Sequence, residues 1–382
     1  MAIDGMKVVD LDSHLVGDLE SWDQTVEDQW RSFLPKKLPT KDNERRKTLV
    51  GNRVMIGSEL GRQKAEKNEW FKPEDLTPQG RVRNMDLDGI DVAVLSPNSP
   101  ALDILWFVDD PELAAAYARA QNNYMKKDGF DVQVLIPDNR MLIYELDAEL
   151  GRQLARAYNE TTAEDISGDD RFIGCAWIYL PDIQESIREL RRAVQDLGMK
   201  AVKFSGGWAD GDLDNEVLWP LYEEIARLDI PILVHPGARV FEAQHSHPWL
   251  VGAERYQGFP HFPTALGFPL TYMVSAARLI FSGVLDRFPT LKFAFFEGGI
   301  GWVPWLMHTL NAHTPDEAGI STAVKQFFDG KQKLKKAPSE YFDQFYIAAV
   351  SWETYLPETI KGWPKHNIII GSDFDHGDAV AT

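Results

Sequence analysis

The sequence contains a single cysteine, Cys175, and this scarcity excludes an internal disulfide and any cluster of thiolate metal ligands. The apolar residues around Cys175 read as a buried strand, so we expect its thiol to be unreactive. The chain has no run of eighteen apolar residues and no charged-then-apolar segment at its start. These absences predict a soluble, cytoplasmic protein whose metal ligands are oxygen and nitrogen atoms.

Basic residues are also few, with 40 Lys and Arg against 58 Asp and Glu and a net charge of −18. Nucleic-acid binding requires clustered positive charge, so this composition predicts no nucleic-acid partner and favours a small-molecule substrate. An anionic substrate would depend on a metal ion together with an arginine, and the candidates are Arg81, Arg83, Arg239 and Arg255.

Strand-like and helix-like segments alternate along the chain, a pattern typical of parallel strands joined by helices. It predicts the α/β class, and within it a (β/α)₈ TIM barrel with long loop insertions over the mouth. The expected strands are residues 7–11, 91–95, 171–179, 201–204, 231–235, 291–296, 344–350 and 367–370.

We expect one domain, residues 1–382, with insertions at about 20–78 and 124–146. Residues 237–264 are rich in aromatic side chains and histidine and predict a flap. This apolar flap favours a homodimer.

Metal-ligand residue types occur where predicted strands end. Asp12 and His14 follow the first strand, His235 ends the fifth, Glu297 follows the sixth and Asp373 follows the eighth. In a closed barrel these ends converge on one mouth, so residues far apart in the sequence can share an ion. The pattern therefore predicts a metal-dependent enzyme.

Four ordered motifs resemble one family. They are Asp12-Ser-His14, His235-Pro-Gly, the segment 282–292 (Ser-Gly-Val-Leu-Asp-Arg-Phe-Pro-Thr-Leu-Lys), and Gly371-Ser-Asp373 with His376. Together they resemble the amidohydrolase-related proteins, and among these the branch of aminocarboxymuconate semialdehyde decarboxylase and the resorcylate decarboxylases. The resemblance implies one divalent ion on Asp12, His14, His235 and Asp373.

We expect zinc as that ion, with manganese or iron as alternatives, and one or two ions per chain. An ion with an open position lowers the pKa of a bound water to about 7. Asp373 is then both a ligand and a proton acceptor. His376, beside Asp375, is a further catalytic candidate.

Glu297 departs from the family, whose decarboxylases carry a histidine at this strand end. The residue types leave three roles open for it: general base, additional ligand, or structural partner of an arginine. The resemblance to the wider amidohydrolase group, which uses a carboxylated lysine on its fourth strand to bridge two ions, implies this role for Lys203; the alternatives are that it binds a substrate carboxylate or points outward. Asp10 shares the strand parity of Asp12 and is either a hydrogen-bonding residue or a ligand. Lys203, Glu297 and Asp10 are thus candidates for a second ion or for the substrate.

Because Glu297 replaces that histidine, the sequence favours hydrolysis by metal-activated water of an organic acid, ester, thioester or ring-cleavage product. The alternative is a metal-dependent, non-oxidative decarboxylase of an aromatic or unsaturated carboxylic acid. A second alternative is a catalytically inactive barrel that serves as a binding protein.

Overall fold

The computed structural model describes residues 8–15, 22–41, 47–50, 53–56, 77–97, 110–125, 133–135, 147–170, 172–206, 213–236, 263–314, 334–350, 352–363 and 367–373. The chain divides into two compact units. Unit 1 comprises Met1–Asp138, Leu142–Lys203 and Gly371–Thr382, and unit 2 comprises Asn139–Met141 and Phe204–Ile370. Within the described ranges, no helix has both the length and the apolar character needed to cross a bilayer.

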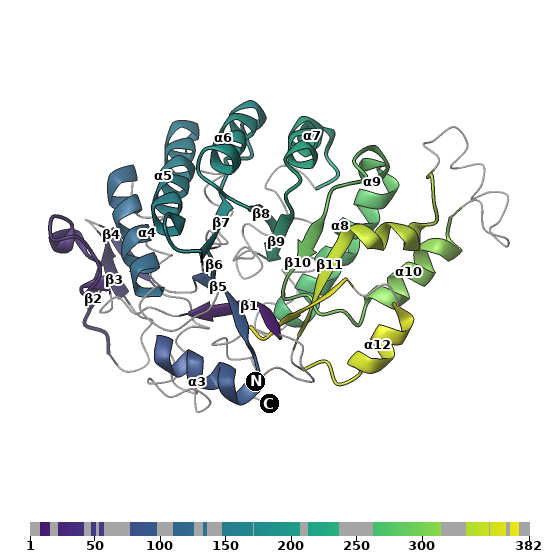
Figure 1. Ribbon diagram of the computed structural model, residues 1–382, viewed down its shortest axis with the longest axis horizontal. Helices are drawn as coiled ribbons and strands as arrows, with labels where there is room; N and C mark the ends of the chain where they lie inside the picture. The colour runs from purple at the N-terminus through teal and green to yellow at the C-terminus, as the bar shows by residue number, and fades with distance from the viewer. Residues whose placement is uncertain are drawn as a thin grey trace. The chain divides into compact units, whose positions relative to one another are not determined.

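Unit 1 is built on parallel strands (Figure 1). Strand β1 pairs with β5, and β6 pairs with β7, which pairs in turn with β8. These strands are β1 (Val9–Leu15), β5 (Val92–Pro97), β6 (Gln133–Leu135), β7 (Phe172–Ala176) and β8 (Ala201–Gly206), whose last three residues belong to unit 2. Parallel pairing requires crossover connections, and helices supply them: α3 (Pro78–Asp88), α4 (Pro111–Met125), α5 (Ala148–Ile166) and α6 (Ile183–Gln195).

Unit 2 repeats the same architecture. Strand β10 (Phe293–Phe295) pairs in parallel with β9 (Ile232–Pro236) and β11 (Phe345–Val350), and β12 (Ile368–Gly371) adjoins β11. The longer helices are α7 (Trp219–Leu228), α8 (Phe268–Phe281), α10 (Val303–Ala312) and α12 (Leu356–Gly362). Shorter helical segments are Arg31–Phe33 in unit 1, and Glu216–Leu218, Pro263–Gly267, α9 (Val284–Arg287) and Pro338–Gln344 in unit 2.

Each strand expected from the sequence is present, which confirms the α/β class. Two features were not predicted. Strand β6 lies within the expected insertion 124–146, and a small antiparallel sheet lies within 20–78, made of β2 (Lys36–Leu38), β3 (Lys47–Val50) and β4 (Arg53–Ile56). These strands have only three or four residues, too few for a periodic pattern to reveal them. The expected flap lies almost entirely outside the described residues.

The described part of the N-terminal insertion packs on α4. Trp22 is fully buried, and its ring lies 5.3 Å from that of Tyr117. Thr25 Oγ1 donates to Ala120 O at 2.8 Å, and Tyr117 Oη donates to Phe33 O at 2.5 Å. These contacts join residues 22–33 to a helix of the main architecture.

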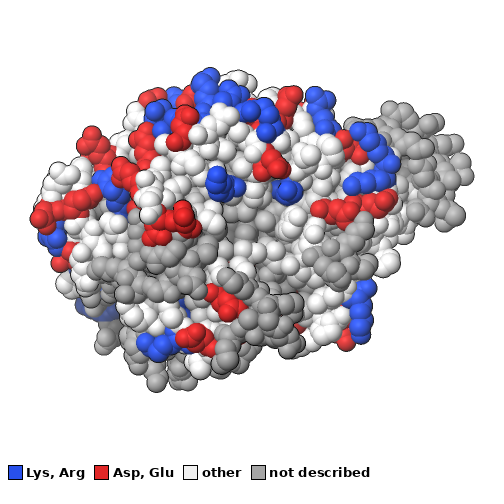
Figure 2. All heavy atoms as spheres, in the orientation of Figure 1, with Lys and Arg blue, Asp and Glu red and all other residues white. Residues whose placement is uncertain are grey.

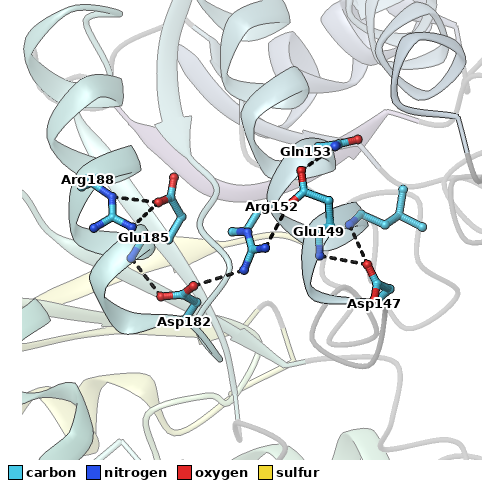
Figure 3. Close-up of polar contacts among 8 residues, drawn as sticks. Asp147, Glu149, Arg152, Gln153, Asp182, Glu185 and Arg188 are labelled. Atoms are coloured by element: carbon cyan, nitrogen blue, oxygen red, sulfur yellow. Dashed lines mark hydrogen bonds and ion pairs between the residues drawn. The ribbon is translucent and has the colours of Figure 1, made fainter.

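Charged side chains of both signs lie intermixed on the face of the molecule shown in Figure 2. At the start of α5 and α6, Arg152 donates to Glu149 at 2.9 Å and to Asp182 at 3.1 Å (Figure 3). Asp147 and Asp182 cap the two helices, and Asp182 accepts from Glu185 N at 3.1 Å. Exposed ion pairs contribute little free energy, so we attribute the stability of the N-terminal ends of α5 and α6 mainly to these caps.

The interior of unit 2 is aromatic. The ring of Tyr222 lies 5.9–6.3 Å from those of Phe204, Phe288 and Phe293. Its hydroxyl donates to Leu213 O at 2.5 Å, so the one polar atom of this buried ring is satisfied. The cluster holds α7 against the strands.

Asn159 joins three elements of unit 1. Its Nδ2 atom donates to Trp177 O and to Glu189 Oε1, both at 2.8 Å, and its Oδ1 atom accepts from Trp177 N at 2.8 Å. Asn159 is fully buried on α5, Trp177 follows β7, and Glu189 belongs to α6. The Asn159 side-chain amide thus forms hydrogen bonds with both backbone groups of Trp177, the residue after β7.

We predict that Asn159→Leu lowers the free energy of unfolding by roughly 2–4 kcal/mol, because it leaves the buried N–H and C=O of Trp177 without these hydrogen bonds. Urea unfolding measures the change. Gln153→Ala, at an exposed position of the same helix, is the control and should change stability by less than about 0.5 kcal/mol. Equal effects of the two substitutions would contradict this assignment.

Candidate metal centre

Strand β1 is irregular where its acidic residues lie. Its register against β5 shifts between Asp10 and Ser13, as in a β-bulge. Such bulges occur often beside active sites, where they change the direction of a side chain. The expected shared parity of Asp10 and Asp12 requires strict alternation along the strand, and the bulge interrupts it. Asp10 is fully buried and Asp12 is 3% exposed.

The Asp10 carboxylate is surrounded by donors within unit 1. Arg81 Nη2 donates to it at 2.8 Å, and both side chains are fully buried. Ser372 donates from its backbone N at 2.9 Å and from Oγ at 2.6 Å, and Asp12 N donates at 3.2 Å. Burial raises the pKa of Asp10, whereas Arg81 and Ser372 lower it. Asp10 thereby ties β1 to α3 and to the residue after β12.

Arg81, one of the four arginines considered for an anionic substrate, is fully buried and pairs with Asp10. Arg83 is exposed on α3, whereas Arg239 and Arg255 lie outside the described residues.

Asp373 lies next to Asp12. Its backbone N donates to Asp12 O at 2.8 Å, and its side chain is 4% exposed. The backbones of Asp12 and Asp373 are therefore neighbours in unit 1, and both residues carry a carboxylate there. His14 belongs to β1, and His376 lies outside the described residues.

In unit 2, His235 and Glu297 lie at the ends of adjacent parallel strands. Val234 of β9 is the register partner of Phe295 of β10. His235 and Glu297, which follow these two residues, therefore lie at the same edge of the sheet. His235 Nε2 lies 3.7 Å from Glu297 Oε1, and the two residues are 3% and 9% exposed. The His235 ring stacks on Phe296, with centroids 6.0 Å apart.

Two of these carboxylate residues have strained backbones. Among the described non-glycine residues, positive φ occurs at Asp229, Glu297 and Asp373, with values of 51°, 58° and 51°. Asp229 ends α7, where this conformation is common. Glu297 and Asp373 instead follow strands, and backbone strain of this kind concentrates at functional sites.

Lys203 lies on the side of the sheet away from α5. A β-carbon at Gly174 would lie 3.2 Å from Thr162 of α5, so Gly174 faces that helix and Cys175 faces away. Cys175 pairs with Ala201, and Lys203, two residues further, shares its face and is 2% exposed. Cys175 is fully buried in β7, as expected from the sequence, and burial raises the pKa of its thiol to about 12.

Glu353 is a further buried carboxylate that was not predicted from the sequence. It follows β11 by three residues and is 9% exposed. The signal that identified Glu297 and Asp373, a carboxylate after an apolar strand, applies equally to Glu353. Its contacts are with the backbone and are described below.

The donor set fits a divalent ion. Within unit 1, Asp12 and Asp373 provide buried carboxylates, and within unit 2 His235 and Glu297 provide an imidazole and a carboxylate. Oxygen and nitrogen donors of this kind suit zinc, manganese or iron(II).

The sequence profile of the amidohydrolase family matches residues 92–376 of the chain. The chain is 26% identical over 256 residues to 2-amino-3-carboxymuconate-6-semialdehyde decarboxylase of Dictyostelium discoideum, a match that covers 65% of this chain and 64% of that protein, less than two thirds of its length. It is 27% identical over 324 residues to gamma-resorcylate decarboxylase of a Rhizobium species, which covers 79% of this chain and 81% of that protein.

Among solved structures, the chain resembles 5-carboxyvanillate decarboxylase of Novosphingobium aromaticivorans, complexed with manganese and 4-hydroxy-3-methoxy-5-nitrobenzoic acid. The TM-score is 0.58 at 18% identity, with 99% of this chain and 88% of that chain covered. Together with the family match, this similarity shows the fold, a (β/α)₈ barrel, and confirms the predicted fold class.

The same comparisons contradict the prediction of hydrolysis. The Dictyostelium, Rhizobium and Novosphingobium proteins are all decarboxylases. The prediction was wrong because it took the replacement of a histidine by Glu297 as evidence for a different reaction.

We predict that Arg81→Met lowers the free energy of unfolding by roughly 3–5 kcal/mol, because it leaves the buried Asp10 carboxylate without its cation. Chemical denaturation measures the loss. Arg83→Met, at an exposed position of the same helix, is the matched control and should cost less than about 1 kcal/mol. A loss as small for Arg81→Met as for the control would show that the ion pair does not stabilise unit 1.

Proposed function

Because this chain belongs to the amidohydrolase family, we propose that it is a metal-dependent enzyme that removes carbon dioxide, without oxidation, from an aromatic carboxylic acid with a neighbouring hydroxyl group. The observation that carries the proposal is the similarity to gamma-resorcylate decarboxylase over 81% of that protein. The buried carboxylates and histidine at the strand ends support it, since they supply the donors that such an enzyme needs.

We assign the ion to Asp12, His14, His235 and Asp373. In the (β/α)₈ fold, site residues lie toward the carboxyl ends of the strands. Asp12 and His14 belong to β1, His235 is near the end of β9, and Asp373 follows β12. When bound, the ion would act as a Lewis acid toward the carboxylate and hydroxyl oxygens of the substrate.

Besides holding the ion, the protein must deliver a proton to the substrate. Decarboxylation replaces a carbon–carbon bond of the ring with a carbon–hydrogen bond, so the ring carbon that bears the carboxylate must receive a proton. Glu297, in its acid form, gives that proton from its carboxyl oxygen. The carbon–carbon bond then breaks, its electron pair restores the aromatic ring, and carbon dioxide leaves. Water reprotonates Glu297 before the next cycle.

The position of Glu297 suits this role. It lies 3.7 Å from His235, so the proposed acid adjoins a proposed ligand. Its 9% exposure limits competition from solvent.

We predict that the purified protein releases carbon dioxide from 2,6-dihydroxybenzoate or 5-carboxyvanillate, and that chelation followed by dialysis abolishes this activity. Added Mn²⁺ or Zn²⁺ should restore it. Elemental analysis should find about one ion per wild-type chain, and much less in His235→Ala. A protein that holds its ion and releases no carbon dioxide from either acid would contradict the proposal.

We predict that Glu297→Gln keeps the ion and the fold but lowers kcat by roughly 10²–10⁴-fold, because an amide cannot deliver the proton. Glu358→Gln, at an exposed position on α12, is the control and should leave kcat unchanged. Loss of the ion from Glu297→Gln would instead make Glu297 a ligand.

A further inference from the structure

The turn that carries Glu297 is conformationally demanding. Residues 297–301 connect β10 to the residues before α10, with φ of 58° at Glu297 and 60° at Gly299. Glutamate with positive φ is disfavoured by its β-carbon, so contacts outside the turn must stabilise this conformation.

Glu353 provides such contacts. Its Oε1 atom accepts from Ile300 N at 2.9 Å and from Gly301 N at 2.8 Å, and its Oε2 atom accepts from Ile300 N at 3.0 Å and from Val350 N at 3.2 Å. Hydrogen bonds to an ionised carboxylate are stronger than those between neutral groups. The Ile300 and Gly301 amides therefore bind a carboxylate of the protein itself and are not free for a substrate carboxylate.

The carbonyls of the same turn are also satisfied by a side chain. Trp302 Nε1 donates to Gly298 O at 3.2 Å and to Gly299 O at 2.8 Å. Two amides of the turn are thus bound by Glu353 and two of its carbonyls by Trp302.

Close packing requires the glycines. A β-carbon at Gly298 would lie 2.3 Å from Tyr272, whose hydroxyl donates to Val234 O, the residue before His235. A β-carbon at Gly299 would lie 3.0 Å from Glu353 Oε1. The sequence Glu297-Gly-Gly therefore matches a turn held between Tyr272 and Glu353.

We propose that Glu353 is a positioning residue, which holds the turn so that the Glu297 carboxyl points toward His235. The inference rests on the proposed role of Glu297 as proton donor. Glu353 touches neither the substrate nor the reacting atoms and acts through the backbone of Ile300 and Gly301. Since small displacements of a reacting group are costly, loss of this support lowers the rate of the proton-transfer step more than it lowers substrate affinity.

The test compares Glu353→Gln and Glu353→Ala with Asp286→Asn. Glu353→Gln preserves the side-chain size, but its amide nitrogen cannot accept a hydrogen bond. Asp286 is also a buried carboxylate of unit 2, and it accepts from Tyr341 Oη at 2.5 Å and from Lys335 N at 3.2 Å. Asp286 lies before β10 and Glu297 lies after β10. Asp286→Asn should therefore reduce stability without affecting the turn of residues 297–301.

Three quantities are measured for each protein: hydrogen exchange at the Ile300 and Gly301 amides, metal content, and kcat and KM for carbon dioxide release from 2,6-dihydroxybenzoate or 5-carboxyvanillate. We expect faster exchange in both Glu353 variants. We also expect kcat lower by about tenfold in Glu353→Gln and by about a hundredfold in Glu353→Ala, with KM and metal content within about threefold of wild type. In Asp286→Asn, thermal stability should fall while kcat and the exchange of these amides stay unchanged.

Wild-type kcat in Glu353→Ala, or an equal loss of kcat in Asp286→Asn, would overturn the positioning role. Rapid exchange of both amides in the wild-type protein would also overturn it, whatever the activity. If the wild-type protein releases no carbon dioxide, the proposed function fails, and the exchange data still decide whether Glu353 holds the turn.

Discussion

The cost of burying a carboxylate shapes the candidate site. A carboxylate removed from water needs an opposite charge and hydrogen-bond donors in its place. Asp10 obtains them from Arg81, Ser372 and the backbone of Asp12. Because these donors come from α3, from the residue after β12 and from β1, satisfying one charge aligns distant parts of unit 1. The alignment extends to Asp373, whose backbone donates to Asp12. The two carboxylates assigned to the ion are thus positioned by a third.

Unit 2 meets the same requirement with neutral donors. Glu353 is compensated by backbone amides and not by an arginine, so its charge stabilises a turn and not an ion pair. In both units a buried carboxylate that is not assigned to the chemistry supports the backbone of one that is. The strain at Glu297 and Asp373 is consistent with this arrangement, since a disfavoured φ persists only where surrounding contacts determine it.

Much of the candidate site could be proposed from the sequence, because a ligand-type residue at the end of an apolar strand has a defined place in the fold. His235, Glu297 and Asp373 follow that rule, whereas Asp12 lies within β1, which extends to Leu15. The partners of the supporting carboxylates could not be predicted in the same way. Arg81 and Asp10 are 71 positions apart, and Ile300 and Glu353 are 53 apart, so only tertiary folding brings them together. Strand β6 escaped prediction for another reason, because three residues carry no measurable period.

The wrong reaction type has a chemical explanation. A general base that takes a proton from water and a general acid that gives one to carbon are the same carboxyl group in two protonation states. We propose Glu297 as a site of proton transfer, and its residue type does not specify the direction of that transfer. Replacing a histidine by Glu297 keeps that capacity, so the replacement is no evidence against decarboxylation. Either group must be oriented toward its reaction partner to transfer a proton. The turn that carries Glu297 is held through its backbone by Glu353 and Trp302.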